Sequence, residues 1–257
     1  MKAVAVLLVV LSFLTVSHGW TCKAGPQQFP AQQIDAGEGQ VVLTDRDSKA
    51  YYLSESTWFE LGSVALKHVS VGPAGIWGVD SSDKVYKYVA GDFILVNGQT
   101  LQQVDAGGDG QVVGVTSGSY IYCLKSSIAL NYSQVGSVSW NELAGRLMYF
   151  SCSPLGCWGV NAVEQIFYTR VTPNTCDISD WIYIPGAALM AEVGTDGNVF
   201  VVNRQGPCFY RTGISPSVPQ GTDWLYIPMC LPIKHVSYDL GQLWLVTKGG
   251  IIMQCSN

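Results

Sequence analysis

Short runs of alternating apolar and polar residues follow one another along this chain, and each run ends at Gly, Pro, Asp or Ser. Such runs predict short β-strands joined by tight turns. Four runs form a unit that recurs about every 40 residues. A unit contains a Val-Ser-Val run, a glycine turn, a Trp-Gly-Val run and a Val-Tyr run, and a Trp-x-x-Leu run stands between one unit and the next. Residues 58–86 show this most plainly and begin with the Trp-x-x-Leu run. The pattern predicts an all-β protein built from copies of one four-stranded unit.

Two kinds of residue recur at fixed spacing in this repeat. One glycine per unit lies between the first and second runs: Gly39, Gly75, Gly110, Gly156, Gly197 and Gly241. An aromatic residue precedes each of the last five glycines by 16 or 17 positions: Trp58, Phe93, Trp140, Trp181 and Trp224. A single four-stranded sheet of this size cannot bury both of its faces, so the copies must pack on one another. We therefore predict a six-bladed β-propeller over residues 20–257, with these aromatic residues in the core between blades.

The chain ends predict how the ring closes. Residues 20–22 resemble a fourth strand without its three partners, and residues 251–255 resemble a third strand without a fourth. Pairing the two ends completes the sixth blade, and Cys22–Cys255 would fasten it.

By the same argument Cys208 lies beside Cys230 in the fifth blade, Cys152–Cys157 clips one hairpin, and Cys123–Cys176 is left as a link between blades. The alternative use of cysteine, a zinc site, is weak because no pair has zinc-finger spacing with a histidine nearby.

The first nineteen residues predict a secretory signal. Lys2 precedes an apolar run, and Ser17-His18-Gly19 places small residues before a cut at Trp20. A membrane anchor would need about twenty apolar residues, so this alternative fails on length. We expect a secreted product without membrane insertion, in which an even number of cysteines forms disulfides. The sequon Asn131-Tyr132-Ser133 predicts a glycosylated surface loop.

Composition narrows the function classes. Only 13% of the residues are charged, and the formal net charge of −5 becomes −6 once residues 1–19, with one lysine and no acid, are removed. Nucleic acid is therefore not expected as a partner. Of the histidines, His68 and His235 occupy the same repeated Lys-His-Val-Ser phrase, which favours a structural role over a unique general base. No nucleophile elbow or zinc-protease motif is present, so we expect a binding protein and not an enzyme.

The repeat resembles the tectonin repeat. The resemblance rests on Trp-x-x-Leu (58–61), Leu-x-x-Val-Ser (66–70), Trp-Gly-Val-Asp (77–80) and Val-Tyr (85–86). It covers the whole of residues 20–257 and is poorer in the last copy, where Leu245 stands for the glycine after Trp. As a secreted, cysteine-rich six-repeat chain it is similar to the fish-egg and tachylectin-type lectins. The resemblance implies binding of N-acetylglucosamine-type sugars and bacterial lipopolysaccharide in innate defence, with calcium in some members. A homodimer is left open.

Alternate copies differ in one position of the first strand. Odd copies carry Asp35, Asp105 and Glu192, where even copies carry Ser70, Ser151 and Ser237. First strands are innermost in a propeller, so these oxygen groups could form a Ca²⁺ site at the axis. The alternative is a hydrated pore in which the three acids never meet, and we favour that alternative.

The same odd copies carry an acid, a glycine and an amide at the first turn: Glu38 with Gln40, Asp109 with Gln111, and Asp196 with Asn198. Carboxylate and amide groups beside an aromatic face could hold sugar hydroxyls and an acetamido group. Acid-glycine sequences are also ordinary β-turns, so the turn alone would explain them. A third possibility is a protein-binding propeller without sugar affinity.

Overall fold

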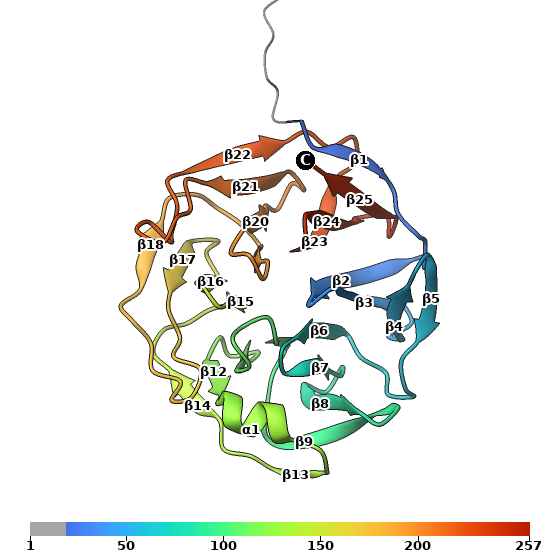
Figure 1. Cartoon of the computed structure of the whole chain (residues 1–257), viewed down its shortest axis with the longest axis vertical. Helices are drawn as coiled ribbons and strands as arrows, with labels where there is room; N and C mark the ends of the chain where they lie inside the picture. Colours follow the sequence, from blue (N-terminus) through green and yellow to red (C-terminus); the bar gives the residue numbers. More distant parts are fainter. Residues whose placement is uncertain (1–18) are drawn as a thin grey trace, which may run out of the picture.

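Each predicted unit folds into one antiparallel sheet, and the six sheets stand around a central axis like the blades of a propeller (Figure 1). The computed structural model describes residues 19–257, so nearly all of the predicted signal segment lies outside the described residues. Within the described part no helix is long and apolar enough to cross a membrane. The predicted all-β, six-bladed fold is confirmed.

The strands of each blade run in order from the axis outward. Blade one holds β2 (Ala31–Gly37), β3 (Gln40–Asp45), β4 (Ala50–Ser54) and β5 (Thr57–Glu60). Blade two holds β6 (His68–Gly72), β7 (Gly75–Val79), β8 (Lys84–Val89) and β9 (Asp92–Thr100). Blade three holds β10 (Gln103–Asp105), β11 (Val112–Val115), β12 (Ile121–Leu124) and β14 (Asn141–Leu143).

The second half of the ring repeats this order. Blade four holds β15 (Tyr149–Ser153), β16 (Gly156–Val160), β17 (Ile166–Thr169) and β18 (Ile182–Ile184). Blade five holds β19 (Met190–Val193), β20 (Val199–Val202), β21 (Cys208–Thr212) and β22 (Asp223–Ile227). Blade six holds β23 (Ile233–Asp239), β24 (Gln242–Thr247), β25 (Ile252–Ser256) and, from the other end of the chain, β1 (Thr21–Ala24).

The two chain ends close the ring as predicted. Strand β1 pairs antiparallel with β25, with Cys22 directly opposite Cys255, and a disulfide joins them. The pairs Cys123–Cys176 and Cys152–Cys157 are also formed.

The fourth predicted pair is not formed, and Cys208 and Cys230 are free thiols. Cys208 lies opposite Ile227 on the neighbouring strand and points into the apolar core. Cys230 comes three residues after the end of β22, at an exposed position. The expected pairing therefore fails because the partner lies beyond the strand, in the link to β23.

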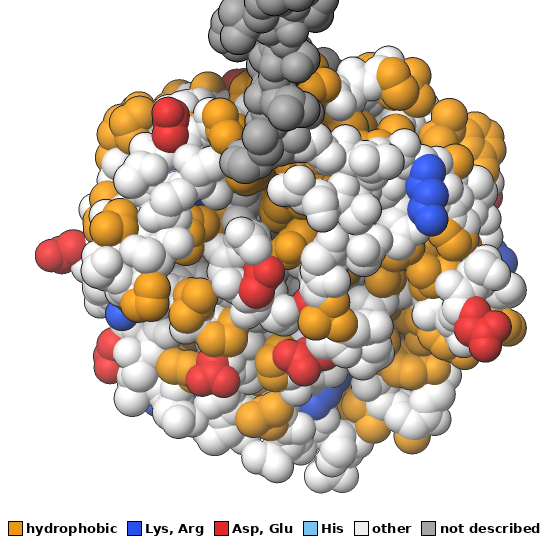
Figure 2. Space-filling view, turned by 45° about the horizontal axis from the view of Figure 1, so that its top comes forward, with side chains coloured by type: hydrophobic (Ala, Val, Ile, Leu, Met, Phe, Trp, Pro, Cys, Tyr) orange, Lys and Arg blue, Asp and Glu red, His pale blue; other side chains and the backbone are white. Residues whose placement is uncertain are grey.

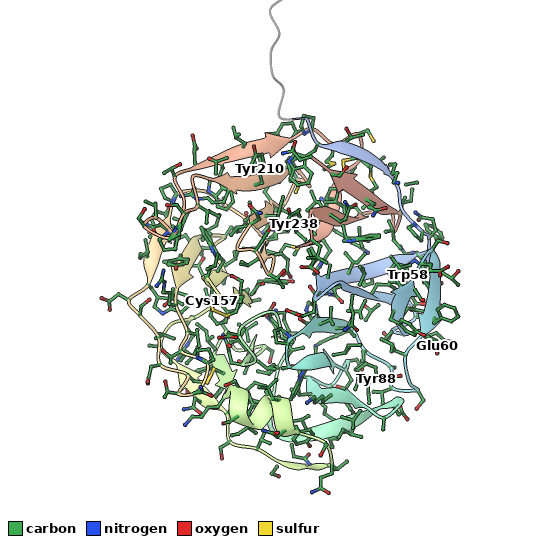
Figure 3. The ribbon with its side chains drawn as sticks, viewed as in Figure 1. Trp58, Glu60, Tyr88, Cys157, Tyr210 and Tyr238 are labelled. Carbon is green, nitrogen blue, oxygen red and sulfur yellow. A yellow bond between two sulfur atoms is a disulfide. The ribbon has the colours of Figure 1, made fainter. Side chains whose placement is uncertain are left out.

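The apolar core lies between the blades and not within them. One cluster joins side chains of blades two and three, another joins blades three and four, and a third extends over blades four, five and six. Trp77 and Trp158 on the second strands are fully buried, as expected for packing residues. Figure 3 shows Trp58 on the outer part of blade one and Tyr238 nearer the axis.

Neighbouring blades approach most closely at the ends of the innermost strands. A Cβ atom on Gly72 would lie 1.9 Å from the carbonyl oxygen of Ala106 in the next blade. Any side chain at that position would push the two blades apart, so the glycine is required by packing.

One insertion interrupts the repeat between β12 and β14. It contains the short helix α1 (Ser126–Asn131) and strand β13 (Gly136–Ser137), which adds to blade two in parallel with β9. The buried Lys87 donates to the carbonyl oxygens of Ala129 and Leu130 at the end of the helix, at 2.7 and 3.2 Å. The sequence did not predict this helix. Asn131 is exposed at its last residue, so the sequon lies on the surface, but at a helix end instead of in a loop.

Candidate functional site

The innermost strands carry their polar residues toward the next blade. Asp35 accepts hydrogen bonds from the Val71 backbone N–H at 2.7 Å and from the Ser237 hydroxyl at 3.0 Å. Asp105 accepts from the Cys152 backbone N–H at 3.0 Å. Ser237 accepts in turn from the Ala36 N–H at 2.9 Å, and Ser70 accepts from the Ala106 N–H at the same distance. The alternation of acid and serine therefore joins neighbouring blades by hydrogen bonds around the axis, from blade six through blade one to blade five.

The third acid at the axis uses its longer side chain differently. Glu192 accepts hydrogen bonds from the hydroxyls of Tyr149 and Ser151, the latter at 2.9 Å. Tyr149 also lies 3.2 Å from Nε2 of His235, and the rings of His68, Tyr149 and His235 lie 5.9 to 6.1 Å apart. These three side chains come from the even blades and together fill the middle of the ring. The axis at this level is packed with side chains.

Burial controls the charge of these groups. Burial raises the pKa of Asp105 to about 8, and the negative charge of Asp35 adds to this effect. Burial also raises the pKa of Glu192 well above its ordinary value, with the charges of Asp35 and Asp105 contributing. The pKa of His68 is lowered by burial to about 4. Burial therefore favours the protonated carboxyl of Asp105 and the neutral imidazole of His68.

The predicted calcium ligands do not form a cation site as they are placed. Asp35, Asp105 and Glu192 are each almost fully buried, and their oxygens are already engaged by N–H and O–H groups of the protein. Among the described residues, no three His, Cys, Asp or Glu side chains are arranged to hold a metal ion. The three acids are close enough to influence one another's pKa but are not brought together as ligands.

The acid-glycine-amide turns lie at the ends of the first hairpins. In blade one, Glu38 and Gly39 have φ values of 54° and 74° and form a two-residue turn between Gly37 and Gln40. Left-handed φ values at both positions are typical of a type I′ hairpin, which explains the glycine. Asp196 is engaged by its own turn, because it accepts from the backbone and the side-chain amide of Asn198, at 2.9 and 2.7 Å.

The other turn residues differ in exposure. Asp109 is exposed, whereas Gln111 is only 2% exposed and packs against Gly108. Gln40 lines a cavity of about 240 Å³ between blades six and one, together with Glu55, Asp239 and Leu240. The structure thus separates the six predicted sugar-binding residues into one buried, one cavity-lining and four surface positions, and it brings no two of the three turns together.

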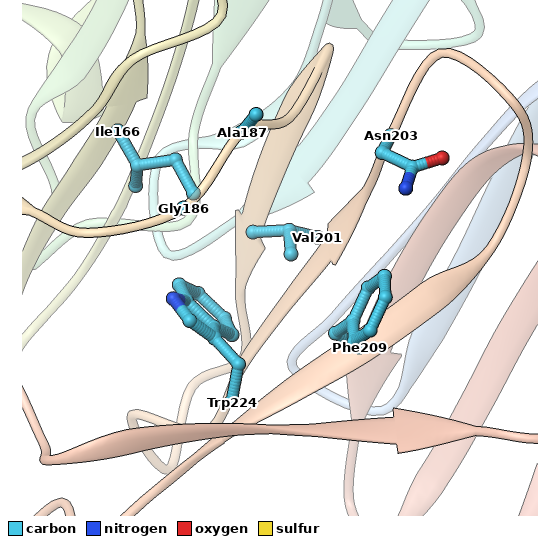
Figure 4. A pocket seen from close by; sticks show the side chains of 7 residues that line it. All are labelled: Ile166, Gly186, Ala187, Val201, Asn203, Phe209 and Trp224. Atoms are coloured by element: carbon cyan, nitrogen blue, oxygen red, sulfur yellow. The ribbon is translucent and has the colours of Figure 1, made fainter.

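A second type of site lies between the outer halves of neighbouring blades. Between blades four and five a crevice of about 320 Å³ opens where the link from β18 to β19 faces blade five (Figure 4). Its lining residues are Ile166, Gly186, Ala187, Val201, Asn203, Phe209 and Trp224. Two aromatic rings, an amide side chain and a stretch of exposed backbone thus face one small space.

The tryptophan of this crevice is held by the preceding blade. Trp224 donates its indole N–H to the carbonyl oxygen of Pro185 at 2.9 Å. Asn203 uses its side-chain oxygen to accept from the N–H groups of Gln205 and Gly206 in its own turn. No described residue accepts a hydrogen bond from the Asn203 amide nitrogen, so this donor is free to bind a ligand. Fixed aromatic faces and a positioned donor are the features expected of a small-molecule site.

The same construction recurs between blades three and four. This crevice has a volume of about 310 Å³ and is lined by Gly145, Arg146, Leu147, Asn161, Phe167 and Trp181. Trp181 donates to the carbonyl oxygen of Ala144 at 2.7 Å, as Trp224 does to Pro185. The two crevices therefore share the glycine link and the two aromatic side chains, but they differ in the amide, because Asn161 Nδ2 donates to Gln165 Oε1 at 2.8 Å.

Between blades two and three the insertion changes this arrangement. The corresponding acceptor, the Asn97 carbonyl oxygen, is occupied by the N–H of Val138, and the indole N–H of Trp140 has no partner among the described residues.

These crevices were not predicted from the sequence. Trp181 and Trp224 stood out as repeated residues but were assigned to the core between blades, and both do pack there while remaining partly exposed. The usable signal was the Ala-Gly or Pro-Gly pair that follows two of the four Trp-x-x-Leu or Trp-x-x-Ile runs, namely Ala144-Gly145 and Pro185-Gly186.

Charged groups are sparse on the molecular surface. Figure 2 shows one face on which a few isolated acidic and basic side chains lie among uncharged and apolar ones. No basic patch is visible on that face, in line with the low charge of the sequence.

Comparison with known proteins agrees with the repeat. The family model for the tectonin domain matches residues 30–248. The fish-egg lectin of Cyprinus carpio is 46% identical over 156 residues. This match covers 60% of the chain and 65% of the carp protein, just under two thirds of that relative.

Solved structures support the fold alone. Virginiamycin B lyase from Staphylococcus aureus aligns with a TM-score of 0.60 at 12% identity, over 93% of this chain and 99% of that one. YCF48 from Cyanidioschyzon merolae aligns with a TM-score of 0.57 at 12% identity, over 92% and 98% of the two chains. The repeat, the closed six-bladed ring and the family match lead to one conclusion: the chain belongs to the tectonin family.

Proposed function

We propose that the protein is a secreted, multivalent lectin that binds N-acetylglucosamine-type sugars on bacterial surface glycans, including lipopolysaccharide and peptidoglycan, in the defence of eggs. The similarity to a fish-egg lectin supports sugar binding in general. The disulfides support an oxidising, extracellular setting. Asn131 is exposed, its Nδ2 donates to the Ser127 carbonyl oxygen at 2.8 Å, and its glycosylation stays a prediction.

The observation that carries this proposal is the pair of similarly placed crevices beside Trp181 and Trp224. A pyranose ring has an apolar C–H face that can pack on an indole or phenyl ring, and hydroxyl and acetamido groups that need fixed hydrogen-bonding partners. Phe209 and Trp224 would supply the apolar contact, and the Asn203 amide would donate to the acetamido oxygen. The backbone at Gly186 is open to the crevice because glycine adds no side chain there.

Two shallow sites on one rigid ring suit a repeated surface better than a free sugar. A single sugar in such a crevice should bind at about millimolar Kd, near −4 kcal/mol. Simultaneous engagement of several sites can raise the apparent affinity by about 10² to 10⁴ without new contacts. The protein should therefore bind free sugar weakly and glycan-coated cells tightly. A homodimer would double the number of sites.

Two secondary proposals concern sugar contacts at the turns between the first and second strands and a calcium ion at the axis. Gln40 and its cavity between blades six and one could form a further sugar contact with Glu38, as could Asp109 and Asp196 on the surface. A calcium ion remains a prediction from the family resemblance, and comparison of the Tm with and without EDTA tests it.

Calorimetry with N-acetylglucosamine tests the function directly. We expect about millimolar Kd and more than one site per chain. The same sugar should inhibit agglutination of bacteria, and chitooligosaccharides should remain intact after long incubation. Absence of any sugar binding would overturn the proposal in favour of a protein-binding scaffold, and cleavage of the oligosaccharide would reveal an enzyme.

A further inference from the structure

The two crevices share their aromatic architecture but differ in charge, and the amide nitrogen that no described residue engages at Asn203 donates to Gln165 at Asn161. Trp181, Phe167 and Asn161 in one correspond to Trp224, Phe209 and Asn203 in the other. The residue after the crevice glycine is Arg146 between blades three and four, and Ala187 between blades four and five. A single position of the repeat therefore places a cation in one crevice and a methyl group in the other.

Arg146 is held at the rim of its crevice by three contacts. Its guanidinium lies 3.8 Å from the ring centre of Tyr120, in a cation–π arrangement. One of its nitrogens donates to the carbonyl oxygen of Gly145 at 2.7 Å. The Glu142 carboxylate lies 3.7 Å away, in an ion pair whose side chains are both about half exposed.

These contacts leave binding capacity on the guanidinium. Arginine has five N–H donors in a planar fork, and only one donates to the Gly145 carbonyl. At 3.7 Å the contact with Glu142 is too long for a strong hydrogen bond, and exposed pairs of this kind are weak. Stacking on Tyr120 limits the motion of the side chain without using its donors. A ligand anion could therefore form a two-point contact with Arg146 at little cost in lost protein contacts.

We propose that the crevice between blades three and four prefers an N-acetylated sugar that carries an anionic substituent, whereas the crevice between blades four and five takes the neutral sugar. This proposal rests on the proposed function, since it assumes that both crevices bind a sugar ring. The sugar ring packs on Trp181 and Phe167, and its carboxylate or phosphate accepts hydrogen bonds from Arg146. One protein thereby binds both neutral and acidic sugar residues of a surface glycan.

The experiment follows each crevice by its own indole N–H resonance in NMR titrations. Trp181 and Trp224 are each part of one crevice, and Trp181→Phe and Trp224→Phe variants assign the two signals. The probes are N-acetylglucosamine, N-acetylmuramic acid, which adds a carboxylate, and N-acetylglucosamine 6-phosphate. Comparison of the last two separates carboxylate from phosphate as the preferred anion.

We expect the Trp181 signal to titrate at about fivefold to tenfold lower concentration with an acidic sugar than with the neutral one. The Trp224 signal should show no such preference. The preference at Trp181 should also shrink in about 0.5 M salt, because an exposed ion pair is screened.

Two reciprocal substitutions supply the control. Arg146→Ala installs the residue of the other crevice, and it should abolish the preference of the Trp181 signal for acidic over neutral sugar. Ala187→Arg should create the preference at Trp224. Both positions are exposed, so the fold should survive, and circular dichroism checks this.

Equal affinity for acidic and neutral sugars at Trp181, or an unchanged preference in Arg146→Ala, would overturn this inference and leave the proposed function intact. Failure of N-acetylglucosamine to shift either signal would overturn this inference, and, if calorimetry also detects no binding, the proposed function as well.

Discussion

Cys22 lies directly opposite Cys255, and the disulfide between them joins residues 233 positions apart in the chain. This bond fastens the outermost strand of blade six, which is supplied by the beginning of the chain. Residues 25–30 connect this strand directly to β2 in blade one. The closure therefore depends on strand pairing and on this one bond.

We predict that Cys22→Ser together with Cys255→Ser lowers the free energy of unfolding by up to about 5 kcal/mol, because the bond restricts nearly the whole unfolded chain. Denaturant unfolding followed by tryptophan fluorescence measures the change. Removing the Cys152–Cys157 bond, which closes only a short hairpin, is the matched control and should cost about 2 kcal/mol. Equal losses in the two variants would contradict a special role for the closing bond.

The axial ring predicts an unusual pH dependence of stability. The pKa of Asp105 is about 8 in the folded protein against an ordinary value of 3.8. The folded state therefore holds this proton more tightly than the unfolded chain, so the associated stability is fully present below pH 3.8 and is lost progressively as the pH rises from 3.8 to about 8. Asp105→Asn mimics the protonated form, so its Tm should already exceed that of wild type at pH 6, and the difference should be at least about 3 °C larger at pH 9.

The comparison between pH 6 and pH 9 avoids interference from His68, whose pKa of about 4 keeps it neutral throughout this range. The exposed Asp180→Asn variant is the control and should follow wild type at both pH values. An Asp105→Asn variant with a lower Tm than wild type at pH 9 would show that the carboxylate form is the stabilising one.

The two free cysteines should differ sharply in reactivity. Cys230 is exposed, whereas Cys208 is fully buried and burial raises its pKa to about 12. A thiol reagent should label one cysteine per chain in the native protein and two after denaturation. Mass spectrometry of the labelled peptides identifies the sites. No labelling under either condition would show that Cys208 and Cys230 are joined after all.

Blocking the crevices should reduce binding in two steps. Ala187→Trp places a large side chain in the crevice between blades four and five, and should remove one sugar site. Adding Arg146→Trp should remove a second site and lower binding to glycan-coated beads by about 10²-fold or more, because avidity is lost. The exposed Ala162→Trp variant is the control for a surface tryptophan outside both crevices. Undiminished binding by the double variant would place the sugar elsewhere.

The repeat predicted the blades, their number and the closure, because strand order and glycine turns are properties of a local sequence unit. The odd acids and even serines were located at the axis correctly. Their partners were not predictable, because Asp35 bonds to the backbone of Val71 in the next blade and Glu192 reaches across to Tyr149. Such contacts depend on side-chain length and on how neighbouring blades approach one another.

The crevices were missed for a related reason. Each combines a glycine link from one blade with aromatic and amide side chains from the next, so no single repeat contains the site. The insertion with α1 and β13 was also missed, because Ser126–Asn131 is shorter than two turns and its end is held by Lys87 from another blade. The pairing of Cys208 with Cys230 failed because it assumed that the outer strand of blade five continues beyond Ile227.

A crystal structure of the protein soaked with N-acetylglucosamine tests the central claim most directly. We predict a sugar ring between blades four and five, packed on Trp224 and Phe209 with its acetamido group at Asn203. Sugar bound only at the first hairpin turns, or at no ordered position despite saturation in solution, would contradict the assignment of these crevices as the binding sites.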